Sequence, residues 1–209
     1  MVESAGKLHP KSLLVAATAD DAPAIATLHA ASWRLAYRGM LPDRYLDEEI
    51  FEDRSQFWAE RFQAPAPERR LILKAISLRT PPQDSRATWP DRPQSPPSTL
   101  DGFACVLLDV DPRWGARLDN LHVRPQLRGT GVGYALFSAA REWIARVAPE
   151  QSMHLYVVEA NHNALRFYDR QGGTVVEHTV RHVARGLTVP ELRYHWPARE
   201  PASADTGRP

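Results

Sequence analysis

The segment VRPQLRGTGVGYAL, residues 123–136, places three of the chain's 11 glycines at alternate positions, Gly129, Gly131 and Gly133, directly before an amphipathic stretch. Glycine lets the backbone adopt positive φ angles and lets a ligand approach the main chain closely. At the start of a helix, such a loop exposes amide N–H groups at the positive end of the helix dipole, which favours phosphate binding. Arg128 adds a cationic side chain. The pattern predicts a pyrophosphate-binding loop between a strand and a helix.

Two well-known phosphate-binding loops do not fit this segment. A P-loop would end in Gly-Lys-Ser or Gly-Lys-Thr, and GVGYA has neither the lysine nor the hydroxyl. A dinucleotide fingerprint spaces its glycines as G-x-G-x-x-G in an early strand-helix-strand unit, with an acidic residue about twenty positions later. Here the order is Arg-Gly-Thr-Gly-Val-Gly, after four expected strands. A tight turn without a ligand is the remaining alternative.

Hydrophobic spacing indicates the elements that must position this loop. In the first helix, Asp20 or Asp21 can cap the N-terminus and Pro23 suits the first turn, while Leu28 and Leu35 recur at helical spacing. Expected helices cover residues 20–40, 51–62, 131–147 and 161–173, and expected strands cover residues 12–19, 70–78, 101–110, 116–123, 153–160, 174–183 and 191–197. This alternation predicts a single α/β domain over residues 12–197.

Residues 80–99 interrupt the pattern, because they hold six of the 18 prolines and few apolar residues. We expect a mobile inserted loop between two strands, in which Trp89 is the one residue that could dock elsewhere. The ends, residues 1–11 and 198–209, are expected to be flexible.

Composition limits the classes of partner. Lysine plus arginine (26) and aspartate plus glutamate (25) almost cancel, which argues against a nucleic-acid binder. The single cysteine, Cys105, excludes an internal disulfide framework and a cysteine-rich zinc site, and in its apolar run it is expected to be buried. Without a recognisable signal peptide or an apolar run long enough for a membrane span, the chain is expected to be cytoplasmic.

The glycine loop resembles a known signature. The run Arg128-x-x-Gly131-x-Gly133, preceded by LHVRP and followed by an apolar helix, is similar to the acyl-CoA-binding motif of the GNAT superfamily of acyltransferases. The resemblance implies an α/β (α+β) fold with a central, twisted, mixed and mostly antiparallel sheet, splayed central strands and flanking helices. It also implies acetyl-CoA as co-substrate and no metal.

A second segment, VVEANHNALRFYDRQGG, resembles another part of the GNAT pattern. After a strand, Asn161, Ala164 and Tyr168 follow at the family's spacing, with Gly172 as a stop. A weaker third match is LHAASWRLAYRGMLPDRYLD, which is similar to the first helix and following loop of many small-molecule members. Together the matches cover most of residues 13–196.

The resemblance assigns cofactor contacts residue by residue. The pantetheine arm is expected against the end of the strand before the loop, the pyrophosphate against the loop amides, and the second motif beside the pantetheine. The side chain of His122 could face either side of its strand, and packing is the alternative to catalysis. The implied cofactor-binding residues are Leu121, His122, Val123, Arg128, Gly129, Thr130, Gly131, Val132, Gly133, Asn161 and Ala164.

Tyr168 is the candidate general acid that the resemblance implies. Attack of an amine on a thioester expels a thiolate, whose conjugate acid has a pKa of about 8.5 if it resembles cysteine. A phenol at the sulfur could donate a proton, an effect of roughly 10²- to 10⁴-fold. Many members carry a glutamate base near the position of Arg117, so this chain departs from the pattern. Asp119, Glu159 or a water relay remain as alternatives for the base.

The acceptor is expected beside the first helix. Trp33 and Tyr37 are four residues apart and share a helix face, as a substrate wall or as core aromatics. The acidic residues of segment 43–49 could attract a cationic amine or simply be solvated. The sequence therefore predicts an N-acetyltransferase for a primary amine of a small molecule, with no nucleic-acid or membrane partner and with a homodimer left open. The alternatives are an acyl-CoA sensor with weak catalysis, or an acetyltransferase for protein N-termini or lysines.

Overall fold

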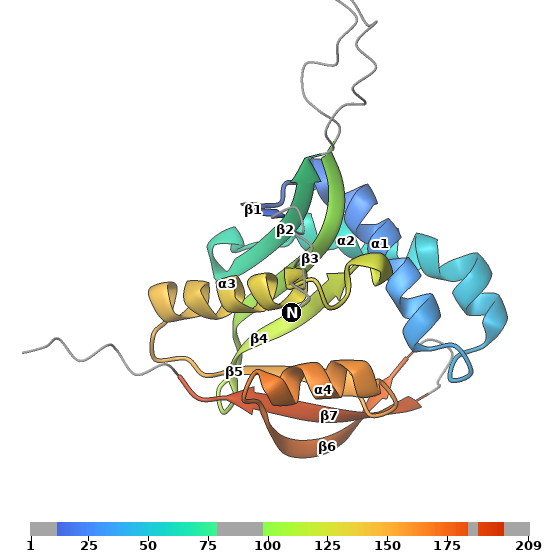
Figure 1. Cartoon of the computed structure of the whole chain (residues 1–209). Helices are drawn as coiled ribbons and strands as arrows, with labels where there is room; N and C mark the ends of the chain where they lie inside the picture. Colours follow the sequence, from blue (N-terminus) through green and yellow to red (C-terminus); the bar gives the residue numbers. More distant parts are fainter. Residues whose placement is uncertain (1–11, 79–97, 184–187, 199–209) are drawn as a thin grey trace, which may run out of the picture.

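A computed structural model describes residues 12–78, 98–183 and 188–198. Seven strands form one sheet in the order β1-β2-β3-β4-β5-β7-β6, and only the β4–β5 pair is parallel (Figure 1). The sheet is therefore mixed and mostly antiparallel, as expected. The strands are β1 (Leu13–Ala16), β2 (Arg70–Leu78), β3 (Ser98–Asp111), β4 (Gly115–Val123), β5 (Met153–Val158), β6 (Thr174–His182) and β7 (Thr188–Trp196).

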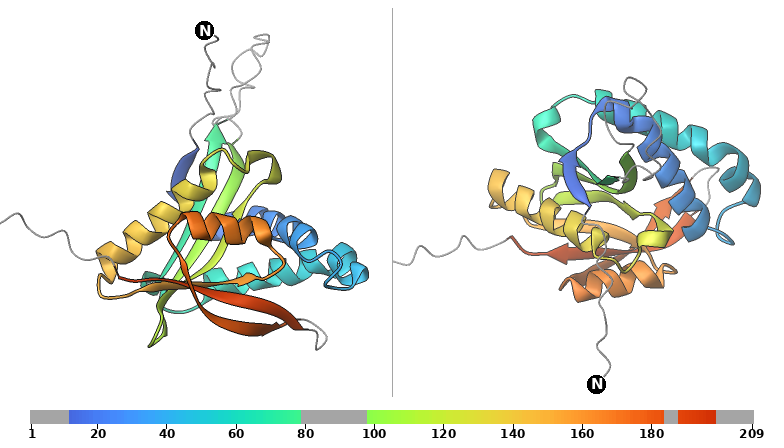
Figure 2. Two further views of the ribbon diagram at one scale, coloured as in Figure 1. Left: turned by 60° about the horizontal axis from the view of Figure 1, so that its bottom comes forward. Right: turned by 45° about the horizontal axis from the view of Figure 1, so that its top comes forward.

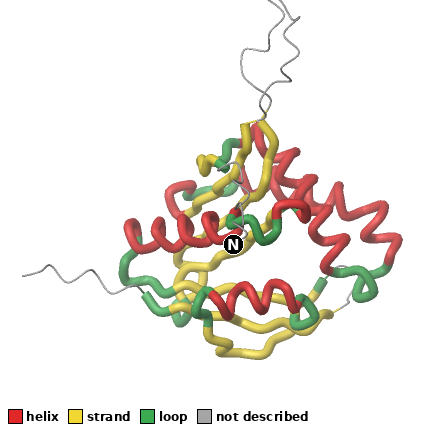
Figure 3. Tube along the Cα trace, viewed as in Figure 1, coloured by secondary structure: helices red, strands yellow, loops and turns green. Residues whose placement is uncertain are grey.

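The middle of the sheet is splayed. Strands β4 and β5 pair only where Ala116 meets Met153 and Arg117 meets His154. Beyond these pairs β4 continues along β3, whereas β5 pairs with β7 along its whole length. The sheet thus consists of an N-terminal half, β1–β4, and a C-terminal half, β5, β7 and β6, which diverge on either side of the splay (Figure 3).

Helices cover both faces of the sheet. Successive side chains of a strand point to opposite faces, and the central strands carry apolar side chains on both, so each face can bury a helix. Ala104 and Val106 of β3 belong to a core with the third helix, whereas Phe103 and Cys105 point into a core with the first two helices. Figure 2 shows the third and fourth helices on the side away from the first two. The helices are α1 (Ala22–Ala36), α2 (Ile50–Gln63), α3 (Val132–Val147) and α4 (His162–Arg170).

Local contacts correct several details of the sequence prediction. Asp21 makes no side-chain cap to α1; its carboxylate accepts a hydrogen bond from the Thr18 N–H at 2.8 Å and forms an ion pair with Lys74 at 2.6 Å. Leu35, expected on the buried face of α1, is 58% exposed. A π-helical turn, Tyr45–Glu49, precedes α2 and has no sequence signature that predicted it.

Several expectations concern segments that the structure describes only in part. Most of the expected loop 80–99, including Trp89, lies outside the described residues, while Ser98 and Thr99 belong to β3. The expected flexible ends also lie outside them, apart from residue 198. In the described part of the chain, none of the helices has the length and apolar character that a membrane span requires.

Candidate active site

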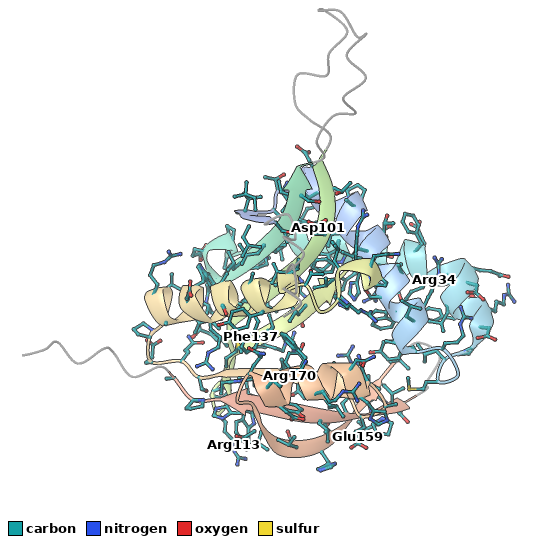
Figure 4. All side chains as sticks on the ribbon, viewed as in Figure 1. Arg34, Asp101, Arg113, Phe137, Glu159 and Arg170 are labelled. Carbon is teal, nitrogen blue, oxygen red and sulfur yellow. The ribbon has the colours of Figure 1, made fainter. Side chains whose placement is uncertain are left out.

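A cavity of about 1090 Å³ lies where the two halves of the sheet diverge. Its walls come from β4, β5, α1, α2, α4, the glycine loop, and the strands β6 and β7. Arg170, labelled in Figure 4 on α4, is one of its lining residues. The cavity has a loop end, formed by Leu121–Val123, Gly129, Gly131, Gly133 and α4, and an α1/α2 end, formed by side chains of those two helices.

Most of the sequence-predicted site residues line this one cavity. Thr130 and Val132 are the exceptions among the candidate cofactor contacts. The predicted residues that do line it are Trp33, Tyr37, Asp119, Leu121, His122, Val123, Arg128, Gly129, Gly131, Gly133, Asn161, Ala164 and Tyr168. Glu159 is not among the lining residues; it is labelled in Figure 4 near β6, where His178 lies 3.0 Å from its carboxylate.

The glycine loop owes its shape to backbone conformations that side chains disfavour. Gly129 has φ of 78° and Gly131 has φ of 94°, both in the region that L-residues rarely adopt. A Cβ atom at either position would meet no atom within 4 Å. The glycines are therefore required by backbone angle, and the open space beside them leaves the loop accessible to a ligand.

Two of the loop amides are used within the loop itself. The N–H of Arg128 donates to the Pro125 carbonyl at 3.3 Å, and the N–H of Thr130 donates to the Leu127 carbonyl at 3.3 Å. The Thr130 hydroxyl donates to that same carbonyl at 2.7 Å and so closes the loop. Arg128 and Thr130 thus hold the loop rather than offer their amides to a ligand.

The amides that remain for a ligand lie at the start of α3. The first bond along this helix runs from the Ala135 N–H to the Gly131 carbonyl at 2.9 Å. The N–H groups of Val132, Gly133 and Tyr134 precede it and therefore have no acceptor within the helix. They point along the helix axis at its positive end, which favours an anion.

The β4 edge facing the splay is the second feature of the loop end. Leu121, His122 and Val123 pair with Ala104, Phe103 and Gly102 of β3 on one side only, because the register between β4 and β5 ends at Arg117. Main-chain groups on the other side of this segment have no strand partner, and all three residues line the cavity. An extended ligand with amide groups could pair with them as an additional strand would.

The start of α4 is fixed by Asn161. Its side-chain oxygen accepts a hydrogen bond from the Ala164 N–H at 3.2 Å, so Asn161 is the N-cap of the helix. This contact uses the side-chain oxygen of Asn161, a residue that the resemblance assigned to cofactor binding, and Asn161 lines the same cavity as Ala164. The asparagine thus orients α4, and through it Tyr168.

Tyr168 lies in α4 among aromatic rings and is only 8% exposed. Its ring packs against Phe137, Phe167, Tyr194 and Trp196 at centroid distances from 5.2 to 6.4 Å. Burial raises the pKa of its hydroxyl well above the usual range, so the phenol stays protonated at neutral pH. The hydroxyl has no hydrogen-bond partner among the described residues, and the residue lines the cavity. The hydroxyl is therefore protonated, and it donates to none of the described residues.

Asp119 is already engaged by cations. Its carboxylate lies 2.9 Å from Arg61 of α2 and 2.9 Å from Arg117, and it accepts a hydrogen bond from the Asn120 side chain at 2.9 Å. The residue occupies an irregular position of β4, where Cys105 pairs with Asn120 but Val106 pairs with Leu118. A substrate amine would have to displace these donors in order to transfer a proton to Asp119.

Two histidines, the buried His29 and the half-buried His122, lie between the ends of the cavity. The rings of His122 and His29 are 4.6 Å apart, and Trp58 donates to Nδ1 of His29 at 3.0 Å. Burial, together with the charges of Arg128, Arg54 and Arg181, lowers the pKa of His122 to about 3. Burial and the same neighbourhood lower the pKa of His29 well below its usual value. Both imidazoles are therefore neutral at physiological pH.

The α1/α2 end combines aromatic and cationic side chains. Trp33 and Tyr37 are buried, with ring centroids 4.5 Å apart, and they belong to a core cluster while one side borders the cavity. They are thus both core aromatics and a cavity wall. Arg54 lies over the ring of Trp33 at 4.5 Å, and over that of Phe57 at 4.9 Å.

Several lining residues had not been identified from the sequence. His29 is four residues before Trp33, and Arg54, Phe57 and Arg61 recur at helical spacing, so a shared helix face was a usable signal. Further lining residues, Tyr156, Arg181 and Glu191, belong to strands and carry no motif. Cys105 is fully buried in a core cluster, and burial raises the pKa of its thiol to about 12.

Solved structures share this architecture. The PaiA N-acetyltransferase of Thermoplasma acidophilum, in complex with coenzyme A, is 19% identical over 86% of this chain and 97% of its own, with a TM-score of 0.57. YncA of Salmonella typhimurium, a putative acetyltransferase with its cofactor acetyl-CoA, is 17% identical over 93% and 98%, with a TM-score of 0.56. A GCN5-related N-acetyltransferase of Rhodopseudomonas palustris is 16% identical over 90% and 96%, with a TM-score of 0.60. At these identities the likeness concerns the fold.

Sequence comparison identifies the family. No curated protein sequence matches the chain. The family model described as "Acetyltransferase (GNAT) family" matches residues 41–173, well over half of the chain, and its match includes the glycine loop and α4. The chain belongs to the GNAT family of acetyltransferases and is an acyltransferase.

Proposed function

We propose that this acyltransferase moves the acetyl group of acetyl-CoA to a primary amine by direct attack within a ternary complex. The observation that carries the proposal is a single cavity joining the glycine loop, the one-sided edge of β4 and the Tyr168 ring to a separate α1/α2 end. Two substrates could thus meet within it. The bound coenzyme A and acetyl-CoA of the related structures support this choice of co-substrate.

The residues at the loop end fit coenzyme A. The N–H groups of residues 132–134 would hold the pyrophosphate, with Arg128 and Arg170 as cationic neighbours. Main-chain groups of Leu121–Val123 would pair with the pantetheine amides, as a β-strand would, and the Asn161 NH₂ group would serve the same arm.

Tyr168 would act as the general acid. Bound acetyl-CoA supplies the acetyl thioester. As the amine nitrogen forms its bond to the acetyl carbon and the carbon–sulfur bond breaks, the Tyr168 hydroxyl gives its proton to the leaving sulfur or stabilises it by a hydrogen bond. The tyrosine recovers a proton from solvent afterwards. No cysteine lines the described cavity, and direct transfer needs none.

Loss of the amine proton is proposed to go through water. Asp119 is engaged by three donors, and Glu159 does not line the cavity. His122 lines it as a neutral ring, so one of its nitrogens can accept a hydrogen bond from the amine or from a water molecule. With its pKa at about 3, His122 would orient the amine and leave the proton to water.

Calorimetric titration with acetyl-CoA and with coenzyme A, followed by a thiol-release assay on amines and peptides, tests the proposal. We expect binding, thiol release that depends on an acceptor, and an acetylated product by mass spectrometry. Intact-protein mass spectrometry with acetyl-CoA alone should show no acetylated enzyme. Binding without transfer to any acceptor would favour the sensor alternative, and transfer only to peptides would favour a protein acetyltransferase. Absence of binding would overturn the proposal.

A further inference from the structure

We propose that the amine accepted by this site carries an anionic group of its own, a carboxylate or a phosphate, and that Arg54 binds it. The inference rests on the proposed function and deepens it, because it names the chemical class of the acceptor. Its starting point is the charge of the cavity wall and the contacts of one guanidinium group.

The described wall of the cavity carries more positive than negative charge. Six arginines and two carboxylates line it, and its histidines are neutral. Arg128 and Arg170 lie at the loop end, beside the proposed site of the cofactor's phosphates. The other charged lining residues are Arg54, Arg61, Arg117 and Arg181 with Asp119 and Glu191.

The two carboxylates are committed to three of these arginines. Asp119 is shared between Arg61 and Arg117, each at 2.9 Å. Glu191, which is buried, lies 2.8 Å from Arg181. These contacts leave one uncompensated positive charge around Asp119 and none at the Glu191 pair. Neither carboxylate faces Arg54 as an ion-pair partner.

Arg54 is held in a fixed place with donor capacity to spare. Its guanidinium lies over Trp33 at 4.5 Å and Phe57 at 4.9 Å, and its side chain is 12% exposed. One nitrogen is 2.7 Å from Asp53, which does not line the cavity and also accepts a hydrogen bond from Tyr45. The Nε atom is buried without a hydrogen-bond partner. A buried guanidinium N–H without an acceptor is costly, and a ligand anion would satisfy it.

The position of Arg54 suits an acceptor whose amine reaches the reaction centre. It packs on Trp33, whose ring is 5.8 Å from that of His29, and His29 contacts His122 at 4.6 Å. Its charge also lowers the pKa of both histidines, after the larger effect of burial, as expected for a neighbour. An anion on Arg54 would leave the amine end of a small molecule directed towards His122 and the splay.

The acidic cluster before α2 does not offset this charge. Asp43 and Asp47 form ion pairs with Arg38, and Glu48 pairs with Arg44. No residue of segment 43–49 lines the cavity. A polycationic amine would thus meet an arginine-rich wall, whereas an amine with a carboxylate or phosphate would meet a complementary one.

Matched pairs of amines that differ only in the anion provide the test. The pairs are lysine and cadaverine, glycine and glycinamide, and phosphoethanolamine and ethanolamine, compared by kcat/KM from thiol release with product mass spectrometry. The anionic member of at least one pair should be preferred by about tenfold or more, as charge-assisted hydrogen bonds predict. The carboxylate and phosphate pairs distinguish the two sources of the anion.

Variants assign the preference to Arg54. Arg54→Gln should raise KM for the preferred anionic amine by about tenfold or more. The KM for the matched amine without the anion should stay nearly unchanged, and acetyl-CoA affinity should be retained. Arg54→Lys should lie between, because it keeps charge but loses the planar donor pair. Arg44→Gln, at an exposed arginine outside the cavity, is the matched control and should change nothing. Added succinate, which has no amine, should compete with the amine in the wild-type protein, a readout that needs no variant.

The outcomes separate the two proposals. Equal or faster transfer to the cationic or neutral members, or an unchanged preference in a folded Arg54→Gln protein, would overturn the anion inference and leave the proposed function standing. Binding of acetyl-CoA without transfer to any member of any pair would count against the proposed function, and the inference would fall with it.

Discussion

Two neighbouring tyrosines allow the proposed general acid, Tyr168, to be tested against a matched control, Tyr194. Tyr168 and Tyr194 have ring centroids 5.8 Å apart, and both are buried. The hydroxyl of Tyr168 has no partner among the described residues, whereas that of Tyr194 donates to Asp169 at 2.7 Å. Tyr194 does not line the cavity. Replacing either by phenylalanine removes one oxygen atom from almost the same aromatic cluster.

The expected effects are opposite. Tyr168→Phe loses no hydrogen bond within the protein, so its free energy of unfolding should stay within about 0.5 kcal/mol of wild type. Its kcat should fall by roughly 10²- to 10⁴-fold, the contribution of general acid catalysis. Tyr194→Phe loses a hydrogen bond to a carboxylate, which costs about 1.5–3 kcal/mol of stability, while kcat should change little.

Urea unfolding measures the stability of each variant, and thiol release under saturating substrates measures kcat. Calorimetric titration checks that acetyl-CoA affinity is retained in both. If Tyr168→Phe kept wild-type kcat, or lost affinity in proportion to activity, Tyr168 would not be the acid. If Tyr194→Phe lost as much activity as Tyr168→Phe, the cluster rather than the hydroxyl would matter, and the reasoning would be refuted.

Two further predictions concern the loop and the histidines. Gly131→Ala should cost about 1–2 kcal/mol of stability because φ at this position is 94°, and it should weaken acetyl-CoA binding. Gly133→Ala, where an added Cβ would meet its nearest atom at 3.6 Å, should cost nothing by unfolding measurements; equal losses would contradict the backbone argument. For His122, the pKa is about 6.5 when unfolded and about 3 when folded, so the unfolded chain binds the proton first as pH falls. Stability should therefore be lost from about pH 6.5 towards pH 3, by at most roughly 2 kcal/mol at about pH 5. His122→Asn should flatten this loss in urea unfolding at about pH 7.5 and 5. If His122→Asn lost as much stability as the wild-type protein between about pH 7.5 and 5, the His122 ring would not be held neutral in the folded state.

Local signals predicted the elements, and their order predicted the fold. The apolar segment 70–78 predicted β2 with its bounds, and helical spacing predicted α2 within a residue at each end. Glycine spacing and the Asn161-to-Tyr168 motif indicated segments that the fold brings to one cavity. These patterns succeed because each depends on neighbouring residues along the chain.

Contacts between distant segments were not predictable in this way. Asp119 was a candidate base because it is the carboxylate nearest to the position at which many family members carry a glutamate, yet Arg61 reaches it from α2, 58 residues away. Arg54 and Phe57 are three residues apart and share one face of α2, but this spacing did not indicate that Trp33 of α1 lies against Arg54. Charge pairing and stacking across elements depend on the packing of helices on the sheet, which sequence spacing alone does not encode.

The splay of the sheet also bears on how the molecule holds together. Direct pairing between β4 and β5 is confined to two pairs of residues at one end of the strands. Elsewhere the halves are joined through helices, where Phe137 of α3 lies 5.2 Å from Trp196 of β7 and where Val158 and Val189 pack with side chains of α1. A ligand that pairs with β4 and also touches α4 would add a removable cross-link where the two strands diverge. Ligand binding should then slow amide hydrogen exchange in β5 and β7, beyond the atoms it touches, and make the two halves unfold together.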